Sequence, residues 1–416
     1  MDTAALFSCA FLSALVAATA LKLWLAGRHM RCVAVHRGLV PAAFAHRIRL
    51  PEHQKAADYT LAKIRLGMAQ GVFAALVLCA LTLGGGVEAF AQPVDRWLYD
   101  GVAQDALLVA GTLVMVAVLH SPFGAYRVFG IDARFGFNRM TPAMYVLDLL
   151  KHAVVFALFV VPLLGLVLWL MRNAGTPWWM YAWGVWLAFN VLLMAIYPGW
   201  IAPLFNRFTP LSDKKLRTRI EKLMQNCGFS AAGLFVMDGS RRSTHSNAYF
   251  TGFGKTKRIV LYDTLLSQLE SDEVEAVLAH ELGHFKLHHV LKQFIFMALL
   301  SLAAMGLLAW LIQQPWFYAG LNAGAPDAAL GLLLFILVGP VFGFFLLPMA
   351  NHFSRRHEFE ADRYAARHAD ASGLIRALTK LYKDNAATLT PDPLHSAFYD
   401  THPPAALRIA RLQQQN

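Results

Sequence analysis

The 416-residue sequence predicts an all-α membrane protein with about seven transmembrane helices. Hydrophobic residues make up 57% of the chain and charged residues only 15%, whereas an ordinary globular domain has about 25% charged residues. Apolar runs near the length that crosses the hydrocarbon core, about 20 residues, recur along the chain. Lys and Arg gather in alternate loops between these runs, as in membrane proteins of fixed orientation. We therefore expect most of the chain to have lipid as its solvent.

Seven apolar runs qualify as spans, and the third is the shortest. They cover Ala4–Ala26, Leu66–Gly84, Ala106–Leu119, Ala153–Met171, Trp178–Tyr197, Val290–Ile312 and Ala328–Ala350. No basic residue precedes the first run, so we expect a retained span and not a cleaved signal peptide.

The basic residues also predict the orientation. Eight Lys and Arg residues lie between spans one and two, and none lies in Gln313–Asp327 between spans six and seven. This places the N-terminus outside, or in the lumen, and the C-terminus in the cytosol. The chain then divides into spans one to five (1–197), a cytosolic segment (198–289), spans six and seven (290–350) and a second cytosolic segment (351–416).

The net charge of +11 and the four cysteines do not by themselves identify a class of partner or a kind of metal site. The basic residues flank apolar runs and form no basic–aromatic motif, so we expect a lipid bilayer and no nucleic acid as partner. None of the cysteines forms a CxxC pair, which argues against a disulfide framework and a thiolate metal site.

A candidate metal helix contains the sequence His280-Glu281-Leu282-Gly283-His284. The two histidines stand one turn apart on one face, a spacing at which two imidazoles bind one zinc ion. Glu281 can then act as general base on a water molecule activated by the metal. The alternative is a chance match on an amphipathic helix.

Neighbouring residues support a helix here. Ser271 is the predicted N-cap, with acidic residues in the first turn. Small and apolar residues beside the motif, at Ala279, Leu282 and Gly283, allow another helix to pack closely around the site.

A third ligand is expected after the last span. Glu358 and Asp362 are four residues apart and share a helix face; Glu358 could complete the zinc site and Asp362 could hold a ligand histidine by its other ring nitrogen. A solvated face with charge pairs is the alternative. His288 competes with Glu358, but on a straight helix it lies too far from His280, and the glycine turn of the metzincin pattern is absent.

At this point the chain resembles the type I CAAX prenyl proteases, integral-membrane zinc metalloproteases of the gluzincin type. The matching segments lie between about residue 130 and the C-terminus. They are Phe135–Arg139, Ala202–Asn206, Ser246–Phe250, Lys257–Leu261, the metal helix, Glu358–Asp362 and Ser396–Arg408.

The resemblance implies a fold and a set of site residues. Seven helices would enclose a water-filled chamber within the membrane, with a gluzincin-like cytosolic zinc-protease domain that contains a small β-sheet. One Zn²⁺ per chain would be bound by His280, His284 and Glu358. The catalytic residues would be Glu281, Asp362, His402 and Arg408, and the substrate-binding edge strand would include Asn247, Ala248 and Tyr249.

Without the resemblance, three of these residues could have ordinary structural roles instead of functional ones. Asn247 precedes a short predicted strand and could equally be a turn residue. His402 could donate a hydrogen bond to an oxyanion, but a histidine beside two prolines is more often an ordinary loop residue. Arg408 alone would be a helix-surface arginine.

Three functions stay open. The first is a CAAX-type endopeptidase that cleaves near the C-terminus of a peptide, prenylated at a C-terminal Cys or otherwise membrane-associated. The second is a broad-specificity quality-control protease of membrane proteins. The third is a non-catalytic transporter or lipid-binding scaffold, although such a protein has no need of all five metal-site residues. The alanine-rich composition favours a bacterial inner membrane over the endoplasmic reticulum, and many bacteria lack prenylation.

Overall fold

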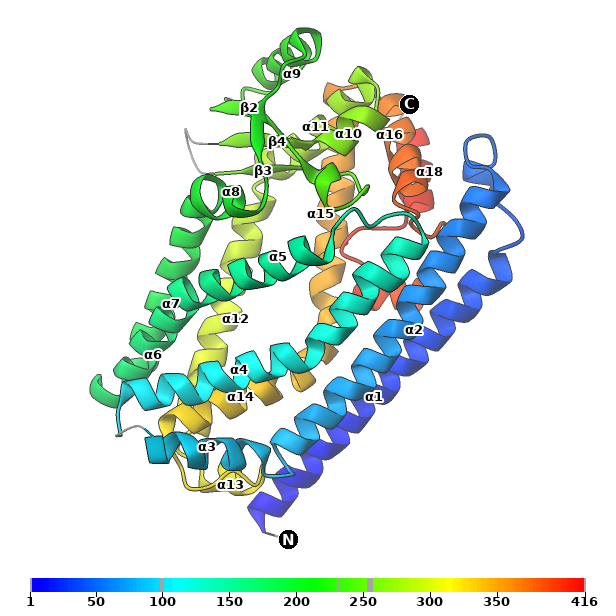
Figure 1. Ribbon diagram of the computed structural model, residues 1–416. Helices are drawn as coiled ribbons and strands as arrows, with labels where there is room; N and C mark the ends of the chain where they lie inside the picture. The colour runs from blue at the N-terminus through cyan, green and yellow to red at the C-terminus, as the bar shows by residue number, and fades with distance from the viewer. Residues whose placement is uncertain (1, 98–99, 231, 253–256, 415–416) are drawn as a thin grey trace.

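The computed structural model describes residues 2–97, 100–230, 232–252 and 257–414. Within these residues, seven helical stretches are long and apolar enough to cross a membrane (Figure 1). They are Thr3–His36, Leu50–Leu81, Val102–Asp132, Pro142–Asn173, Trp178–Phe205, His289–Leu311 and Ala328–His368. The predicted number of spans is therefore confirmed, including the short third one.

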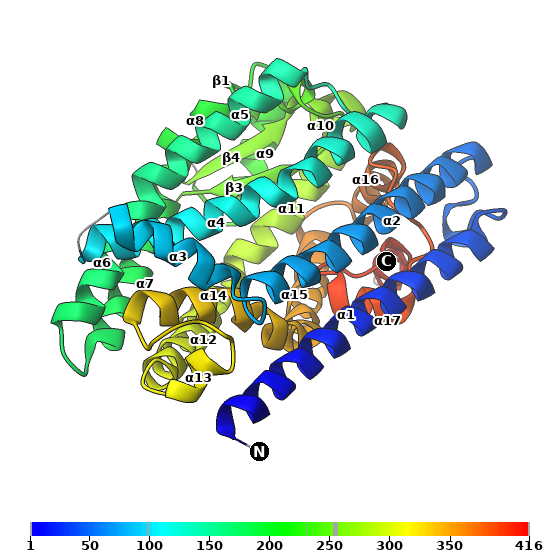
Figure 2. The same ribbon diagram turned by 60° about the horizontal axis from the view of Figure 1, so that its bottom comes forward.

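The stretches are built from labelled helices and short π or 3₁₀ segments. They are α1 (Thr3–His36), α2 (Leu50–Leu81), α4 (Val102–Ala125), η2 (Tyr126–Asp132), α5 (Pro142–Val155), η3 (Phe156–Val160), α6 (Val161–Asn173), α7 (Trp178–Ile196), η4 (Tyr197–Ile201), α8 (Ala202–Phe205), α12 (His289–Leu311), α14 (Ala328–Gly343), η7 (Phe344–Leu346) and α15 (Leu347–His368). Figures 1 and 2 show α1 and α2 running side by side as a hairpin.

Most of these helices extend beyond the predicted spans, because hydropathy marks only the part of a helix that suits lipid. The second span was expected from Leu66, yet α2 begins at Leu50. The backbone N–H of Arg49 donates to the Glu52 carboxylate at 2.8 Å, so a capping interaction starts the helix in polar sequence. The last stretch continues past Ala350 to His368, so the last span and Glu358 share one helical stretch.

The segment after α8 forms the only sheet within the described residues. Its strands are β1 (Phe208–Pro210), β2 (Gly233–Met237), β3 (Ala248–Thr251) and β4 (Arg258–Tyr262), in the order β1-β2-β4-β3. β2 and β4 are parallel, and β3 pairs antiparallel with β4, with Tyr249 opposite Val260. This confirms the small sheet and places β3 at its edge.

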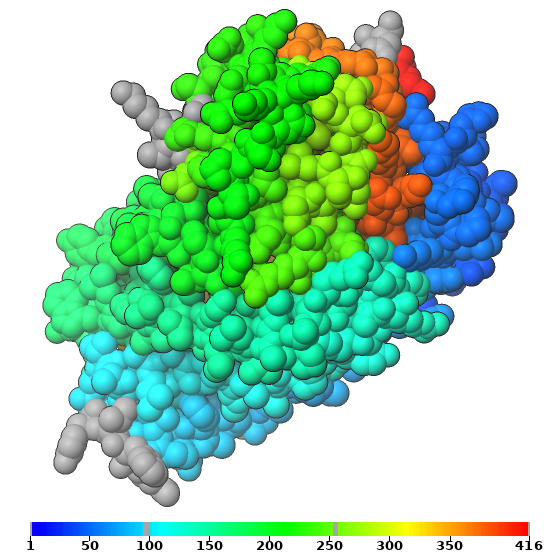
Figure 3. Space-filling model, turned by 45° about the horizontal axis from the view of Figure 1, so that its top comes forward, coloured from blue at the N-terminus to red at the C-terminus, as the bar shows by residue number. Residues whose placement is uncertain are grey.

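The remaining helices pack around the sheet, at the opposite end of the membrane helices or, for α17, against α15 and α1. They are α3 (Gly86–Trp97), α9 (Lys214–Asn226), α10 (Asp263–Gln268), α11 (Ser271–Lys286), α13 (Pro315–Ala319), α16 (Ala371–Asp384), α17 (Pro393–Tyr399) and α18 (Ala405–Gln413). Figure 3 shows the green, yellow-green and orange segments forming a continuous cap beside the blue and cyan helices.

Two main hydrophobic cores lie at opposite ends of the molecule. One joins the sheet to α9, α11, α16 and α18, and the other joins α1, α4, α6, α13 and α14. Between them the helices pack sparsely: the buried residues of α12 are His289, Leu308 and Ala309, all at its ends. Sparse packing in the middle of the spans supports the predicted chamber, which stays a prediction.

Candidate metal centre

Helix α11 carries the two candidate histidine ligands. Its N-cap is Glu270, whose backbone N–H donates to the Glu273 carboxylate at 2.8 Å. The predicted N-cap, Ser271, is therefore wrong by one residue: Ser271 already lies in the helix, and the acidic residue before it forms the capping box. The predicted acidic first turn is present at Asp272 and Glu273.

Close contact between α11 and α15 brings the ligands together. Ala279 and Leu282 are fully buried. A Cβ atom added at Gly283 would lie 3.0 Å from the Ala361 Cα atom, closer than most Cβ contacts in proteins, so glycine favours this approach. The small residues beside the motif thus bring the helix with Glu358 against the helix with His280 and His284, as expected.

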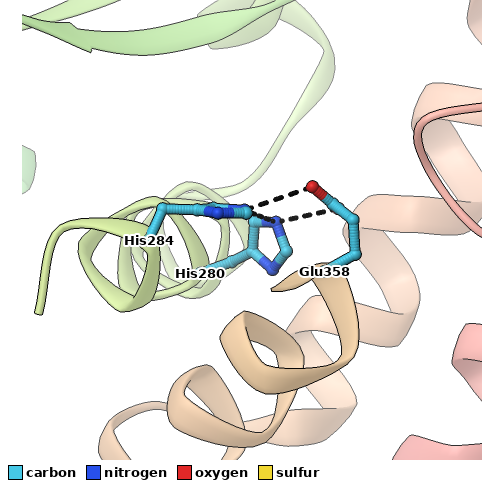
Figure 4. A group of neighbouring side chains, drawn as sticks. All are labelled: His280, His284 and Glu358. Atoms are coloured by element: carbon cyan, nitrogen blue, oxygen red, sulfur yellow. Dashed lines mark hydrogen bonds and ion pairs between the residues drawn. The ribbon is translucent and has the colours of Figure 1, made fainter. Parts of the chain in front are cut away.

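Three donor atoms converge between these helices, as Figure 4 shows. The Nε2 atoms of His280 and His284 are 3.3 Å apart. The Glu358 carboxylate places one oxygen 3.4 Å from His280 Nε2 and the other 3.2 Å from His284 Nε2. Ligand atoms bound at about 2.0–2.1 Å to a tetrahedral zinc ion stand roughly 3.3–3.4 Å apart. The separations between these donor atoms therefore fit a zinc site.

The chemistry of the donors supports a cation at this position. Glu358 is 4% exposed, and its Oε2 atom is buried without a hydrogen-bond partner. Two imidazole nitrogens and a carboxylate that face one another at van der Waals distance repel unless protons or a cation lie between them. A metal ion satisfies all three groups at once.

Asp362 and Arg408 form the surroundings of His280. His280 Nδ1 lies 2.9 Å from Asp362 Oδ1. Arg408 donates from Nε and Nη2 to the two Asp362 oxygens at 2.8 and 2.6 Å. Arg408 is 6% exposed and lies 3.6 Å from Glu358. It is therefore no helix-surface arginine, and its guanidinium holds the carboxylate that orients His280.

Glu281 lies between the two candidate ligands, His280 and His284, in sequence and is half-buried. Burial raises the pKa of its carboxyl above the ordinary value, and the nearby imidazoles of His280 and His284 oppose this increase. A carboxylate with a raised pKa is better suited to take up and return a proton near neutral pH.

His402 also reaches the cluster, from the loop between α17 and α18. Its Nε2 atom is 3.3 Å from Glu358 Oε1, and 62% of its side chain is exposed. Arg355 on α15 donates to the backbone oxygens of Ser396, Ala397 and Asp400 and so fixes the approach to this loop. An exposed imidazole beside a buried carboxylate can meet a substrate that enters the site.

The predicted substrate residues lie on the free edge of the sheet. Asn247 is exposed just ahead of β3, and its side-chain oxygen accepts from the N–H of Ala248. Ala248 is buried in the hydrophobic core that joins the sheet to α11, whereas the Tyr249 ring lies beside the Tyr262 ring. β3 also packs against α11, the metal helix.

His288 lies outside the cluster of His280, His284 and Glu358, but the reason differs from the expected one. α11 does not continue straight through this residue. It ends at Lys286, and His288 is exposed with φ +57°, in the left-handed region, before α12 begins. Sequence reasoning missed the neighbour that this bend turns inward: His289 is buried, and its Nδ1 lies 3.1 Å from His284 Nδ1. The adjacent histidines His288 and His289, just after the motif, were the sequence feature that could have indicated a further residue near the metal centre.

Comparison with known families gives two matches that together span most of the chain. A model described as the CAAX prenyl protease N-terminal region with five membrane helices matches residues 29–207. A model of peptidase family M48 matches residues 210–416, which include every site residue above.

Individual proteins are similar over comparable lengths. A CAAX prenyl protease 1 homologue from rice is 38% identical over 73% of this chain and 72% of its own length. A homologue from Caenorhabditis elegans is 32% identical over 98% of both chains. The crystal structure of S. mikatae Ste24p superposes with a TM-score of 0.91 at 27% identity, over 99% of both chains.

Proposed function

Because the chain belongs to the CAAX prenyl protease family, whose catalytic region is peptidase family M48, we propose that His280, His284 and Glu358 bind one catalytic zinc ion. The protein is a metalloendopeptidase of the membrane. We further propose that it cleaves prenylated peptides near their C-terminus. The observation that carries the proposal is the convergence of three donor atoms at 3.2–3.4 Å. Family membership favours this enzyme over a non-catalytic transporter or scaffold.

Each side chain around the proposed metal site has a separate role in hydrolysis. A zinc ion held by His280, His284 and Glu358 would supply Lewis acidity toward a water molecule and the scissile carbonyl. Glu281 accepts the proton of the attacking water and returns it to the leaving amine. His402 donates a hydrogen bond to the oxygen on which negative charge develops. Asp362, held by Arg408, keeps the proton of His280 on Nδ1, so that Nε2 stays free for the metal.

The edge strand β3 is proposed to hold the peptide backbone. One edge of β3 pairs with β4, and no strand within the described residues pairs with the other. A peptide can add to a free edge through main-chain hydrogen bonds, which grip it without demanding a particular sequence. Asn247, Ala248 and Tyr249 would form this contact.

An apolar cavity beside the strand supports a lipid anchor on the substrate. Its volume is about 740 Å³, and it begins at Phe250 on β3 and at Phe285, next to the ligand His284. It extends to Val191 on α7 and Phe294 on α12, both on candidate membrane helices. A cavity that extends from the edge strand to the membrane helices suits the isoprenoid chain of a prenylated cysteine, because it removes apolar surface from water.

Peptide cleavage by purified protein tests the lipid preference. Wild type should cleave a farnesylated peptide with a lower KM than the same peptide without the lipid. Val191→Trp fills the cavity and should raise the KM for the farnesylated peptide alone. Leu192→Trp is the matched control, because Leu192 is also exposed on α7 but does not line the cavity. Equal cleavage of both peptides by wild type would favour broad-specificity quality control.

Metal removal tests the zinc assignment. A chelator should abolish cleavage, and added Zn²⁺ should restore it. Glu358→Gln should lower the zinc content measured by elemental analysis, because it removes the one anionic ligand. Stoichiometric zinc in Glu358→Gln would contradict the ligand set.

The orientation is also proposed, with the metal centre and the C-terminus in the cytosol. Its support is the predicted charge bias of the loops. The sheet and the C-terminus lie at one end of the helices and the N-terminus at the other (Figure 1). Protease-cleavable tags at the two termini, tested in sealed vesicles of known sidedness, should be cut from opposite sides.

A further inference from the structure

A chain of hydrogen bonds extends from the second histidine ligand away from the metal centre. His284 Nδ1 lies 3.1 Å from His289 Nδ1, and His289 Nε2 lies 3.1 Å from Glu360 Oε2. The three residues come from α11, α12 and α15. His289 is 3% exposed, whereas 31% of the Glu360 side chain is exposed, so the chain runs from the buried metal centre toward the surface. We infer that His289 and Glu360 are positioning residues that fix the ring of His284 for metal binding.

The direction of each hydrogen bond follows from the ligand geometry. His284 Nε2 faces His280 and Glu358, so it is the atom available to the metal. The ring proton of His284 then belongs on Nδ1, where it is donated to His289 Nδ1. His289 must carry its own proton on Nε2, from which it donates to Glu360. One arrangement of hydrogen-bond donors and acceptors therefore satisfies all three groups.

Ring contacts hold His289 in this orientation. His357 stacks on it with the ring centroids 4.2 Å apart and the planes 10° from parallel. The His284 ring meets it edge-on at 5.1 Å. The left-handed residue His288 separates α11 from α12, and it allows a residue five positions after His284 to turn back toward it. His289 is thus set by packing on two sides as well as by its hydrogen bonds.

The two histidine ligands are therefore supported in different ways. His280 donates directly to a carboxylate, Asp362, which Arg408 neutralises. His284 reaches its carboxylate, Glu360, through an intervening imidazole. Such partners set the tautomer and orientation of a ligand, and their loss typically lowers metal affinity about 10–100-fold. We expect losses of this order when the His289 contact is removed.

The inference rests on the proposed zinc site and is tested by metal binding as well as activity. Zinc affinity is measured by competition with a chelator, and the Co²⁺-substituted protein reports ligand geometry through its visible absorption. His289→Leu should weaken zinc binding about 10–100-fold, change the Co²⁺ spectrum and lower kcat more than it raises KM. Glu360→Ala should act in the same direction. Glu360→Gln should recover part of the affinity, because its amide oxygen still accepts from His289.

A matched control separates positioning from simple packing. His53 is also a buried histidine with one backbone hydrogen bond, from Nε2 to the His36 oxygen at 2.9 Å, but it lies outside the metal centre. His53→Leu should lower thermal stability without changing zinc affinity. Unchanged zinc affinity and Co²⁺ spectrum in both His289→Leu and Glu360→Ala would overturn the inference. If His289→Leu does not fold, Glu360→Ala and Glu360→Gln decide alone. Full zinc binding in Glu358→Gln would instead contradict the ligand set, so the two failures are distinguishable.

Discussion

Arg408 binds both carboxylate oxygens of Asp362, 46 residues earlier in the chain, through Nε at 2.8 Å and Nη2 at 2.6 Å. Both side chains are buried, and Asp362 also lies 2.9 Å from His280 Nδ1. The pair joins the C-terminal helix α18 to the helix that bears Glu358. Its bidentate geometry fixes the carboxylate plane, and with it the ring of His280, a proposed metal ligand.

Removal of Arg408 alone should therefore be costly. Arg408→Met leaves Asp362 buried without its cation, a change that typically costs about 3–5 kcal/mol. The double variant Arg408→Met with Asp362→Asn should lose less free energy of unfolding than the two single variants summed, because no buried charge stays unpaired. Unfolding in detergent measures all three. Simple additivity would show that the two residues do not act as a pair.

Glu281→Gln should abolish most activity while the metal stays bound. A general base contributes about 10²–10⁴-fold to the rate, so kcat should fall by that factor. Glu275→Gln on the same helix is the control, because the Glu275 carboxylate pairs with Arg219 away from the metal centre. Zinc content should be equal in both variants and wild type. Wild-type kcat in Glu281→Gln would remove this residue from the mechanism.

Gly283→Ala should separate α11 from α15. The added Cβ would meet the Ala361 Cα atom at 3.0 Å and the Tyr364 Cβ atom at 3.1 Å. Overpacking of this kind costs about 1–3 kcal/mol, and zinc affinity should fall with it because Glu358 moves relative to the histidines. Gly339→Ala in α14 has nothing within 4 Å of the new atom and should leave both properties intact. Equal stability and equal zinc affinity in Gly283→Ala and Gly339→Ala would show that the contact of α11 with α15 at Gly283 does not position Glu358.

Asp370 provides a pH-dependent cap for α16. Its carboxylate accepts from the N–H groups of Ser372 and Gly373 at 2.9 and 3.1 Å. The Ser372 hydroxyl bound to it holds the pKa of Asp370 below its ordinary value, against a smaller opposing effect of burial. Because the pKa is lower in the folded state, the stabilisation is present above the unfolded pKa of about 3.9 and is lost as pH falls through the folded pKa.

Asp370→Ala should accordingly cost about 1 kcal/mol at neutral pH. The difference in thermal unfolding midpoint between this variant and wild type should shrink below about pH 4. Asp370→Asn keeps a capping oxygen without a titratable group, so its stability relative to Asp370→Ala should not depend on pH. A constant difference between wild type and Asp370→Ala down to pH 2 would contradict the assignment.

Much of the site could be predicted because its key spacings are local. Two residues four positions apart on a helix must stand one turn apart, so His280 and His284 share a face whatever the rest of the chain does. The same periodicity put Glu358 beside Asp362. Membrane spans are equally readable, because the hydrocarbon core requires long apolar segments.

Other features depend on contacts between residues far apart in the chain. No local sequence pattern predicts that Arg408 is buried against Asp362. Nor does the apolar pattern predict that α2 begins sixteen residues before its apolar run. The straight-helix argument about His288 failed at a single left-handed residue, which hydrophobic periodicity does not encode.

The sequence by itself determined the seven spans, the metal helix and the residue types of a zinc-protease site. Only the tertiary structure decided how α11 and α15 cross at Gly283, which brings Glu358 within 3.2–3.4 Å of the histidine nitrogens. It alone decided that His289 turns inward toward His284. The physical reason is that periodicity fixes positions within one helix, whereas the relative placement of two helices depends on the packing of all the side chains between them.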